Sequence, residues 1–249
     1  MEKERLLDFV GRYHLGGEIE ATVWETTNGS LLTKFITGDK SMIGDVTMNN
    51  FTGFEDGVEL GVLTTSQLVR MSTVLSDDVA LKINKIDNGD EMKHVSIDLF
   101  DNGNDVTYML ADLSVVQRSK GLKQTPSFNV SFNLTKDFVD TYIRAKGALS
   151  ETKIFTLLKD KDGTFKVVLG YSQVNTNRII MGIDVDGEQT PAIDRPISFN
   201  AEYFKNILIA NKAAKLATLQ VSDEGLAYVH IEDGDYIANY YLVEAETDA

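Results

Sequence analysis

Residues 63–71, LTTSQLVRM, and residues 199–207, FNAEYFKNI, decide the fold, because they share one pattern at an offset of 136. In both stretches apolar residues recur at intervals of three and four, which is typical of a helix with one buried face. Residues 6–10, LLDFV, and 138–142, FVDTY, form a second such pair at an offset of 132. An internal duplication of about 130 residues is the simplest interpretation.

The pattern predicts four helices, each with one buried face. Their expected ranges are Lys3–Tyr13, Thr65–Leu75, Thr135–Ala145 and Asn200–Lys212. Three of them have a side chain that can cap the first turn. These candidates are Thr64 or Thr65 for the second helix, Thr135 for the third and Asn200 for the fourth.

For the rest of the chain, the sequence predicts antiparallel sheet. Asn-Gly and Asp-Gly pairs, which favour tight hairpin turns, recur between alternating or β-branched stretches. They lie at Asn28-Gly29, Asp56-Gly57, Asn88-Gly89, Asn102-Gly103, Asp162-Gly163, Asp186-Gly187 and Asp233-Gly234. The order helix, strands, helix, strands occurs twice, so the fold class is α+β with two similar domains. We place domain 1 at residues 1–117, a linker with Gly, Ser and Pro at 118–129, and domain 2 at 130–249.

Composition limits the classes of function. The 249 residues contain no cysteine and carry a formal net charge of −14. Disulfides and thiolate metal sites are therefore excluded, and a reducing compartment is favoured. No apolar stretch approaches the length of a membrane span, and the first residues lack a signal-peptide core, so we expect a cytoplasmic protein without a membrane partner.

Bulk acidity opposes nucleic-acid binding, yet basic residues are concentrated on the predicted helices. Segments 2–14, 63–76, 134–149 and 199–215 together carry +4, which leaves −18 for the remaining chain. The basic residues of these segments include Arg5, Arg12, Arg70, Lys136, Arg144, Lys146, Lys205, Lys212 and Lys215. Helical wheels place Lys205, Lys212 and Arg144 opposite the buried faces. On any one helix these are ordinary solvated charges, but four such helices could line one phosphate-binding surface.

With its repeated units and basic helices, the chain resembles the processivity sliding clamps of DNA replication, the family of proliferating cell nuclear antigen and the T-even phage clamps. The resemblance rests on LGVLTTSQLVRMSTVLSDDVALKI, Leu60–Ile83, and on the end of the chain, ANYYLVEAETDA, with its acidic tail. It implies a DNA-clamp fold in which two similar domains carry sheets outside and helices inside. It also implies a closed homotrimeric ring around double-stranded DNA, in which Lys205 and Lys212 are the first candidates for phosphate contacts and the other basic residues named above are weaker ones. These contacts would be sequence-independent, and a viral clamp is the subtype we favour.

The resemblance also implies two kinds of protein contact. Ring closure would pair the last strand of domain 1, Tyr108–Val116, with an edge of domain 2, Arg178–Val185. The apolar residues expected at that join are Tyr108, Met109, Leu110, Leu113, Ile179, Ile180 and Ile183. DNA polymerase and a clamp loader would dock through short peptide motifs. Candidate contacts, by position, are Met42, Ile43 and Val46 of an early loop, Leu122 and Pro126 of the linker, and Tyr241, Leu242 and Val243.

Catalysis and cofactor binding are not indicated. His14, His94 and His230 have no ligand-like spacing. Asp160-Lys161-Asp162-Gly163 fits a hairpin turn better than a calcium loop, because Leu158 and Leu169 occupy the positions that need acids. We therefore expect no enzyme activity, no metal and no cofactor. The alternative hypothesis is a structural virion or adhesion protein built from two related β-rich domains.

Overall fold

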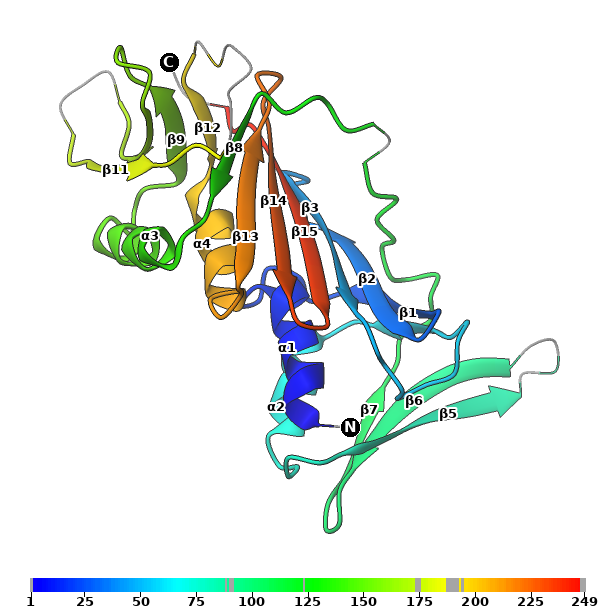
Figure 1. Ribbon diagram of the computed structural model, residues 1–249. Coiled ribbons are helices and arrows are strands. Elements are labelled where there is room, and N and C mark those ends of the chain that lie inside the picture. Colours follow the sequence, from blue (N-terminus) through cyan, green and yellow to red (C-terminus); the bar gives the residue numbers. More distant parts are fainter. Residues whose placement is uncertain are drawn as a thin grey trace. The chain divides into compact units, whose positions relative to one another are not determined.

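The computed structural model describes residues 2–87, 89, 92–122, 124–172, 176–186, 193 and 195–246 (Figure 1). Contacts divide the chain into two compact units, which split at Gly121–Leu122, inside the predicted linker. Unit 1 comprises Met1–Ile36, Gly44–Gly121 and Asp235–Ile237, and unit 2 comprises Thr37–Ile43, Leu122–Gly234 and Ala238–Ala249. No helix in the described part of the chain is long and apolar enough to span a membrane.

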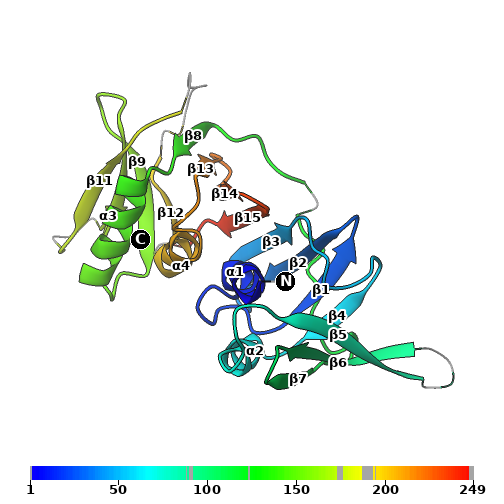
Figure 2. The ribbon, with the colours of Figure 1, turned by 60° about the horizontal axis from the view of Figure 1, so that its bottom comes forward.

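Unit 1 contains two helices and two antiparallel sheets (Figure 2). Its helices are α1 (Lys3–His14) and α2 (Thr65–Ser72), which contact each other. Within one sheet, its strands follow the order β4-β1-β2-β3, formed by Glu59–Val62, Thr22–Thr27, Ser30–Ile36 and Met42–Met48. Strand β3 belongs to unit 1 from Gly44 onward. The other has the order β5-β6-β7, formed by Ala80–Asp87, Met92–Phe100 and Asp105–Met109.

Unit 2 repeats this arrangement with one more strand. Its helices α3 (Lys136–Ala148) and α4 (Ala201–Ala210) contact each other. One sheet has the order β11-β10-β9-β12, formed by Ile179–Ile183, Phe165–Leu169, Ile154–Lys159 and Ile197–Asn200. The second contains β15 (Tyr236–Val243), β14 (Leu226–Asp233), β13 (Leu216–Val221) and β8 (Val130–Asn133), in that order. Strand β15 belongs to unit 2 from Ala238 onward. The predicted α+β fold with a duplicated order of elements is confirmed.

All four predicted helices are present, and only their ends differ. The second stops at Ser72 and the fourth at Ala210, so Lys212 lies in the turn after α4. Asn28 and Gly29 both have positive φ, 50° and 70°, and they form the two-residue loop between β1 and β2. Because glycine lacks a Cβ, it adopts this conformation readily. Parts of two predicted turns, Asn88 and Gly187, lie outside the described residues. The same holds for the end of the acidic tail, Thr247–Ala249.

An aromatic cluster forms the centre of unit 1. Phe9 and Tyr13 of α1 lie edge-on to Trp24 of β1, with ring centroids 5.7 and 6.4 Å apart. Trp24 Nε1 donates to Tyr13 Oη at 3.2 Å, and Tyr13 Oη lies 3.2 Å from Thr65 Oγ1 at the start of α2. Both helices are thus fixed to the sheet through one buried tyrosine.

A similar cluster and one ion pair fix α3 to α4 in unit 2. Phe204 of α4 lies 4.8 Å from the rings of both Tyr142 and Phe155. Lys146 Nζ lies 3.0 Å from Glu202 Oε2 and donates to the Ser150 carbonyl at 2.7 Å. Burial alone would raise the pKa of Glu202, but hydrogen bonds from Lys205 and Lys146 outweigh it, and the pKa is lowered.

Replacing Phe9 with alanine should destabilise unit 1 by about 3–5 kcal/mol, because it opens a cavity at a side chain that is fully buried. Urea unfolding followed by the fluorescence of Trp24, the one tryptophan of the chain, measures the change. Arg70→Ala on exposed α2 surface is the control and should change stability by less than about 0.5 kcal/mol. Equal stability of Phe9→Ala and the native protein would contradict the assigned core.

Glu202→Gln should lower stability at pH 7 by about 1 kcal/mol, because Lys146 stays buried without its anionic partner. The folded-state pKa of Glu202 is lowered, so its contribution is present above its ordinary pKa of 4.5 and is lost as the pH falls below that value. The gap between native protein and variant should therefore close in acid. Thermal unfolding at pH 7, 5 and 3 tests this, and a gap independent of pH would refute it.

Candidate nucleic-acid interface

Short-range capping sets where the helices begin. Thr135 Oγ1 accepts from the backbone N–H of Phe138 at 3.2 Å, and Asn200 Oδ1 accepts from Glu202 at 2.9 Å and Tyr203 at 3.0 Å, as predicted. Thr64 precedes α2 but makes no such bond. Instead, Glu20 Oε2 accepts from the N–H of Ser66 at 2.9 Å, which places an anion at the positive end of α2. Local sequence does not reveal this distant cap.

The three predicted basic contacts of unit 1 have different environments. Arg70 is exposed in the last turn of α2. Arg5 is half-buried, and its Nη2 lies 2.7 Å from Asp235 Oδ2. Arg12 is only 4% exposed, with its guanidinium 4.5 Å from the centre of the Tyr236 ring. The expectation that Arg12 points to solvent is wrong, because its long side chain lies along an aromatic ring from a distant strand.

In unit 2 the predicted basic residues separate into two groups. Those exposed to solvent are Lys136, Arg144, Lys212 and Lys215. Lys205 is half-buried and paired with Glu202. Lys146 is 4% exposed and bound to Glu202 and Ser150, so the expectation that it is a surface contact is wrong. A helical wheel locates the Cα of Lys146 but not the carboxylate of α4 to which its side chain reaches.

Two acidic residues lie among the exposed cations of unit 2. A groove along α3 and the turn after α4 is lined by Asp137, Asp140, Thr141, Ile143, Arg144 and Lys212. Lys212 Nζ lies 2.8 Å from Asp140 Oδ1, and hydrogen bonding from this ammonium lowers the pKa of Asp140. Two carboxylates therefore balance two cations in the groove. Such a surface attracts phosphate weakly, and the attraction is screened by salt.

The predicted subunit-interface residues of unit 1 lie at a sheet edge. Strand β7 is the outer strand of β5-β6-β7, and it ends at Met109, before the predicted end at Val116. Met109 is 66% exposed, and Leu110 and Leu113 are half-buried. Tyr108 is buried and accepts from the N–H of Thr64 at 3.1 Å, so its expected place on an exposed join is wrong.

The predicted edge in unit 2 is β11, the outer strand of β11-β10-β9-β12. Ile180 is 52% exposed and Ile179 is half-buried. Ile183 is buried in its own unit, because strand alternation turns it toward the core, so its expected exposure is wrong. A groove follows this strand, lined by Gly163, Thr164, Phe165, Lys166, Gly182, Ile183, Asp184 and Val185.

Three of the predicted partner contacts are core residues. Met42, Val46 and Leu242 are fully buried, so they are wrong as surface contacts. Residues 42–48 form the strand β3 rather than a loop, and its side chains alternate between buried and half-buried. The others remain accessible: Ile43, Leu122, Pro126 and Tyr241 are half-buried, and Val243 is 42% exposed.

Sequence reasoning missed an aromatic stack in unit 2. The rings of Tyr228 and Tyr241 are nearly parallel, with centroids 4.7 Å apart, and Phe128 stacks on Tyr228 at 5.6 Å. All three side chains are half-buried, and Phe128 lies near the end of the linker, two residues before β8. Alternation along β14 and β15 could have placed both tyrosines on one face, but only the register brings them together.

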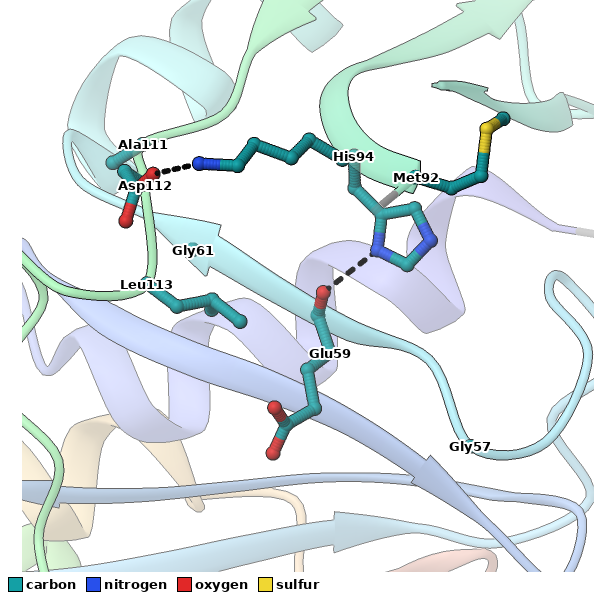
Figure 3. Close-up of a pocket in the computed structure, with 9 residues that line it drawn as sticks. Gly57, Glu59, Gly61, Met92, His94, Ala111, Asp112 and Leu113 are labelled. Atoms are coloured by element: carbon teal, nitrogen blue, oxygen red, sulfur yellow. Dashed lines mark hydrogen bonds and ion pairs between the residues drawn. The ribbon is translucent and has the colours of Figure 1, made fainter. Parts of the chain in front are cut away.

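A pocket in unit 1 gathers ionisable residues without a catalytic arrangement (Figure 3). His94 Nδ1 donates to the main-chain carbonyl of Glu59 at 3.0 Å, and Lys93 Nζ lies 3.2 Å from Asp112 Oδ2. Arg118 holds the Glu59 carboxylate through two bonds of 2.7 Å, away from the imidazole. The imidazole and the carboxylates thus have separate partners, and none of the nine residues that line the pocket is a serine, threonine or cysteine.

The other histidines and the Asp160–Gly163 turn also have structural partners. His14 Nε2 lies 3.0 Å from Ser66 Oγ, and His230 Nδ1 lies 2.8 Å from Asn239 Oδ1. Asp160 and Gly163 form the hairpin turn between β9 and β10, as predicted. Within the described ranges, no three or more His, Asp or Glu side chains are grouped to hold a metal ion.

No protein-family model matches the sequence, and no curated protein matches it significantly. Solved structures do match over nearly the whole chain. One is proliferating cellular nuclear antigen from Entamoeba histolytica, with a TM-score of 0.72, 12% identity, and coverage of 98% of this chain and 97% of that chain. Another is A. fulgidus PCNA with the C-terminal region of FEN-1 bound, with a TM-score of 0.72, 14% identity and the same coverage. The chain has the fold of these clamp proteins.

Proposed function

We propose that this chain is the subunit of a sliding clamp, of which three copies close a ring around double-stranded DNA. The ring would tether a DNA polymerase and other partners during processive synthesis. The observation that carries this proposal is the match of both units, in one continuous chain, to clamp structures over 98% of the residues. A structural β-rich protein would need neither this fold nor the exposed cations beside its helices.

Ring closure would use the edges of β7 and β11. Each is the outer strand of its sheet and carries a large exposed apolar side chain, Met109 and Ile180. An outer strand exposes backbone N–H and C=O groups that another strand can pair with. Pairing β7 of one copy with β11 of the next is a head-to-tail contact, and such contacts generate rings when the rotation closes.

The DNA contacts would come from exposed cations beside the helices. They are Arg70 in unit 1 and Lys136, Arg144, Lys212 and Lys215 in unit 2, although Lys212 is paired with Asp140. Arg5 and Lys205 would contribute less, because each is half-buried as well as paired with a carboxylate. Asp137 and Asp140 dilute the positive charge of α3. Weak, sequence-independent contacts suit a ring that is held by topology and must still slide.

Partners would bind through short peptide motifs, with the half-buried apolar residues of unit 2 as anchors. We assign this role to Leu122, Pro126, Ile43 and Tyr241, with Val243 beside them. The structure of A. fulgidus PCNA, which holds the C-terminal region of FEN-1, is a precedent for docking of a partner's terminus on this fold. A clamp loader, a viral source, a cytoplasmic location and the lack of enzyme activity stay predictions.

The particle in solution should have about three times the 27.6 kDa mass of the chain. Met109→Asp or Ile180→Asp should give folded monomers, because a carboxylate at the join would lose its hydration. Ile86→Asp, at an exposed apolar residue of β5, the other outer strand of the sheet that contains β7, is the control and should stay trimeric. Light scattering after gel filtration measures the masses. A monomeric native protein, or variants that assemble normally, would argue for the structural alternative.

Removing two exposed cations of α3 should weaken binding to duplex DNA. The variant is Lys136→Gln/Arg144→Gln, and the control with the same charge change is Lys159→Gln/Lys161→Gln on the β9–β10 hairpin. Fluorescence anisotropy at several salt concentrations gives the dependence of affinity on salt. The slope should fall by about one for each phosphate that the variant no longer neutralises. An equal effect of both variants would show that only net charge matters and that α3 is not the DNA-binding surface.

A further inference from the structure

The second sheet of unit 2 has a strand that covers the outer edge of β13. Strand β8 pairs antiparallel with β13, with Phe132 opposite Leu219 and Val130 opposite Val221. These four apolar side chains are at most 6% exposed. Strand β8 thus supplies hydrogen-bond partners for the outer edge of β13, and its apolar side chains are buried with those of β13 (Figure 1).

The equivalent strand of unit 1 is β5. The offset of 136 residues relates the start of α2 to that of α4, and the start of β5 to that of β13. Residues Lys82–Lys85 therefore correspond to Thr218–Val221. In the described part of the chain, β5 pairs along its length with β6 alone, and it is the outer strand of β5-β6-β7 (Figure 1).

The residues just before β5 form a short antiparallel pairing with the residues just before α1, but this pairing does not extend along β5. Glu2, just before α1, forms an antiparallel bridge with Asp78, and the N–H of Lys3 donates to the Asp77 carbonyl at 2.7 Å. In unit 2 it is β8, just before α3, that occupies the corresponding place. Beyond Asp78, none of the described segments forms a strand on this edge. Ile83 is accordingly half-buried, whereas its counterpart Leu219 is fully buried.

The charges on β5 decide what can pair with it. Lys82 and Lys85 flank the segment, and the register shifts between Asn84 and Lys85. Lys85 Nζ lies 2.9 Å from Glu55 Oε1, so an acid opposite Lys85 would share this ammonium with Glu55. Lysines and bulges are features that discourage pairing between identical edges. Two copies paired antiparallel about the middle of the segment would place Lys82 opposite Lys85 of the other copy, and like charges directly opposite are destabilising. A second copy is therefore a poor occupant, and an acidic segment is a good one.

We propose that the outer edge of β5 binds an extended segment of another protein, antiparallel, with the pattern acid, polar, large apolar, acid. The large apolar residue would lie opposite Ile83, as Phe132 lies opposite Leu219. The two acids would lie opposite Lys82 and Lys85, where opposite-charge pairs across strands are stabilising. This mode of recognition adds a strand to a sheet, so backbone bonds supply affinity and side chains supply specificity. It does not depend on the proposed clamp function.

A labelled synthetic peptide with the central sequence Asp-Ser-Phe-Glu tests the proposal on the full chain by fluorescence anisotropy. It should bind saturably, and Lys82→Glu/Lys85→Glu should weaken binding by about tenfold or more. A Lys-Ser-Phe-Lys peptide should show the reverse preference. Lys159→Glu/Lys161→Glu carries the same charge change at another site and should bind like the native protein. Absence of saturable binding, or equal weakening by both variants, would overturn the proposal.

Amide hydrogen exchange gives a second readout within the same molecule. Without peptide, the amides of Lys82–Lys85 that face away from β6 should exchange much faster than those of Thr218–Val221, which β8 covers. Added peptide should slow only the β5 amides. If both segments are equally protected without peptide, the β5 edge is closed and the proposal fails. Protection gained elsewhere, with β5 unchanged, would also overturn it.

Discussion

The hydrogen-bonding capacity of the sheet edges is the constraint on which the rest of this structure depends. Every strand that ends a sheet leaves N–H and C=O groups that water or another strand must satisfy. Here β7, β11 and β5 are outer strands, and the side chains along β5 differ from those along the other two. β7 and β11 carry exposed apolar residues, Met109 and Ile180, whereas β5 combines an exposed apolar residue, Ile86, with lysines and a shifted register. The first two thus resemble halves of an interface, and the third resembles an edge reserved for an acidic partner.

Both units expose positively charged side chains beside their helices, where the proposed ring would contact DNA. Helices packed on buried aromatic clusters expose cations on their outer turns, and the chain as a whole stays strongly acidic. Because Lys212 is paired with Asp140, a phosphate that binds Lys212 must compete with the Asp140 carboxylate. In the proposed clamp, this pairing would lower the affinity of Lys212 for DNA. For a ring that remains on DNA because it is closed, low affinity at each contact is an advantage, since tight contacts would stop sliding.

The sequence predicted the elements well and the side-chain environments less well. Helical spacing, the caps Thr135 and Asn200 and the Asn28-Gly29 turn depend on neighbouring residues, and all are confirmed. Arg12 and Lys146 were assigned to solvent, but tertiary contacts with Tyr236 and Glu202 bury them. Met42, Val46 and Leu242 were placed by analogy of position, although their strands alternate and turn them inward. Contacts that form only in three dimensions are therefore what sequence patterns miss.

The central claim is a ring that is topologically linked to DNA, and the absence of cysteine allows a direct measurement of that link. A variant with cysteines at Met109 and Ile180 would be mixed with closed circular duplex DNA, cross-linked with a short bis-maleimide and treated with detergent. If the ring encloses DNA, cross-linked protein stays with circular DNA in detergent and is released when the DNA is cut once. Release from intact circles, or equal retention on cut and intact DNA, would contradict it.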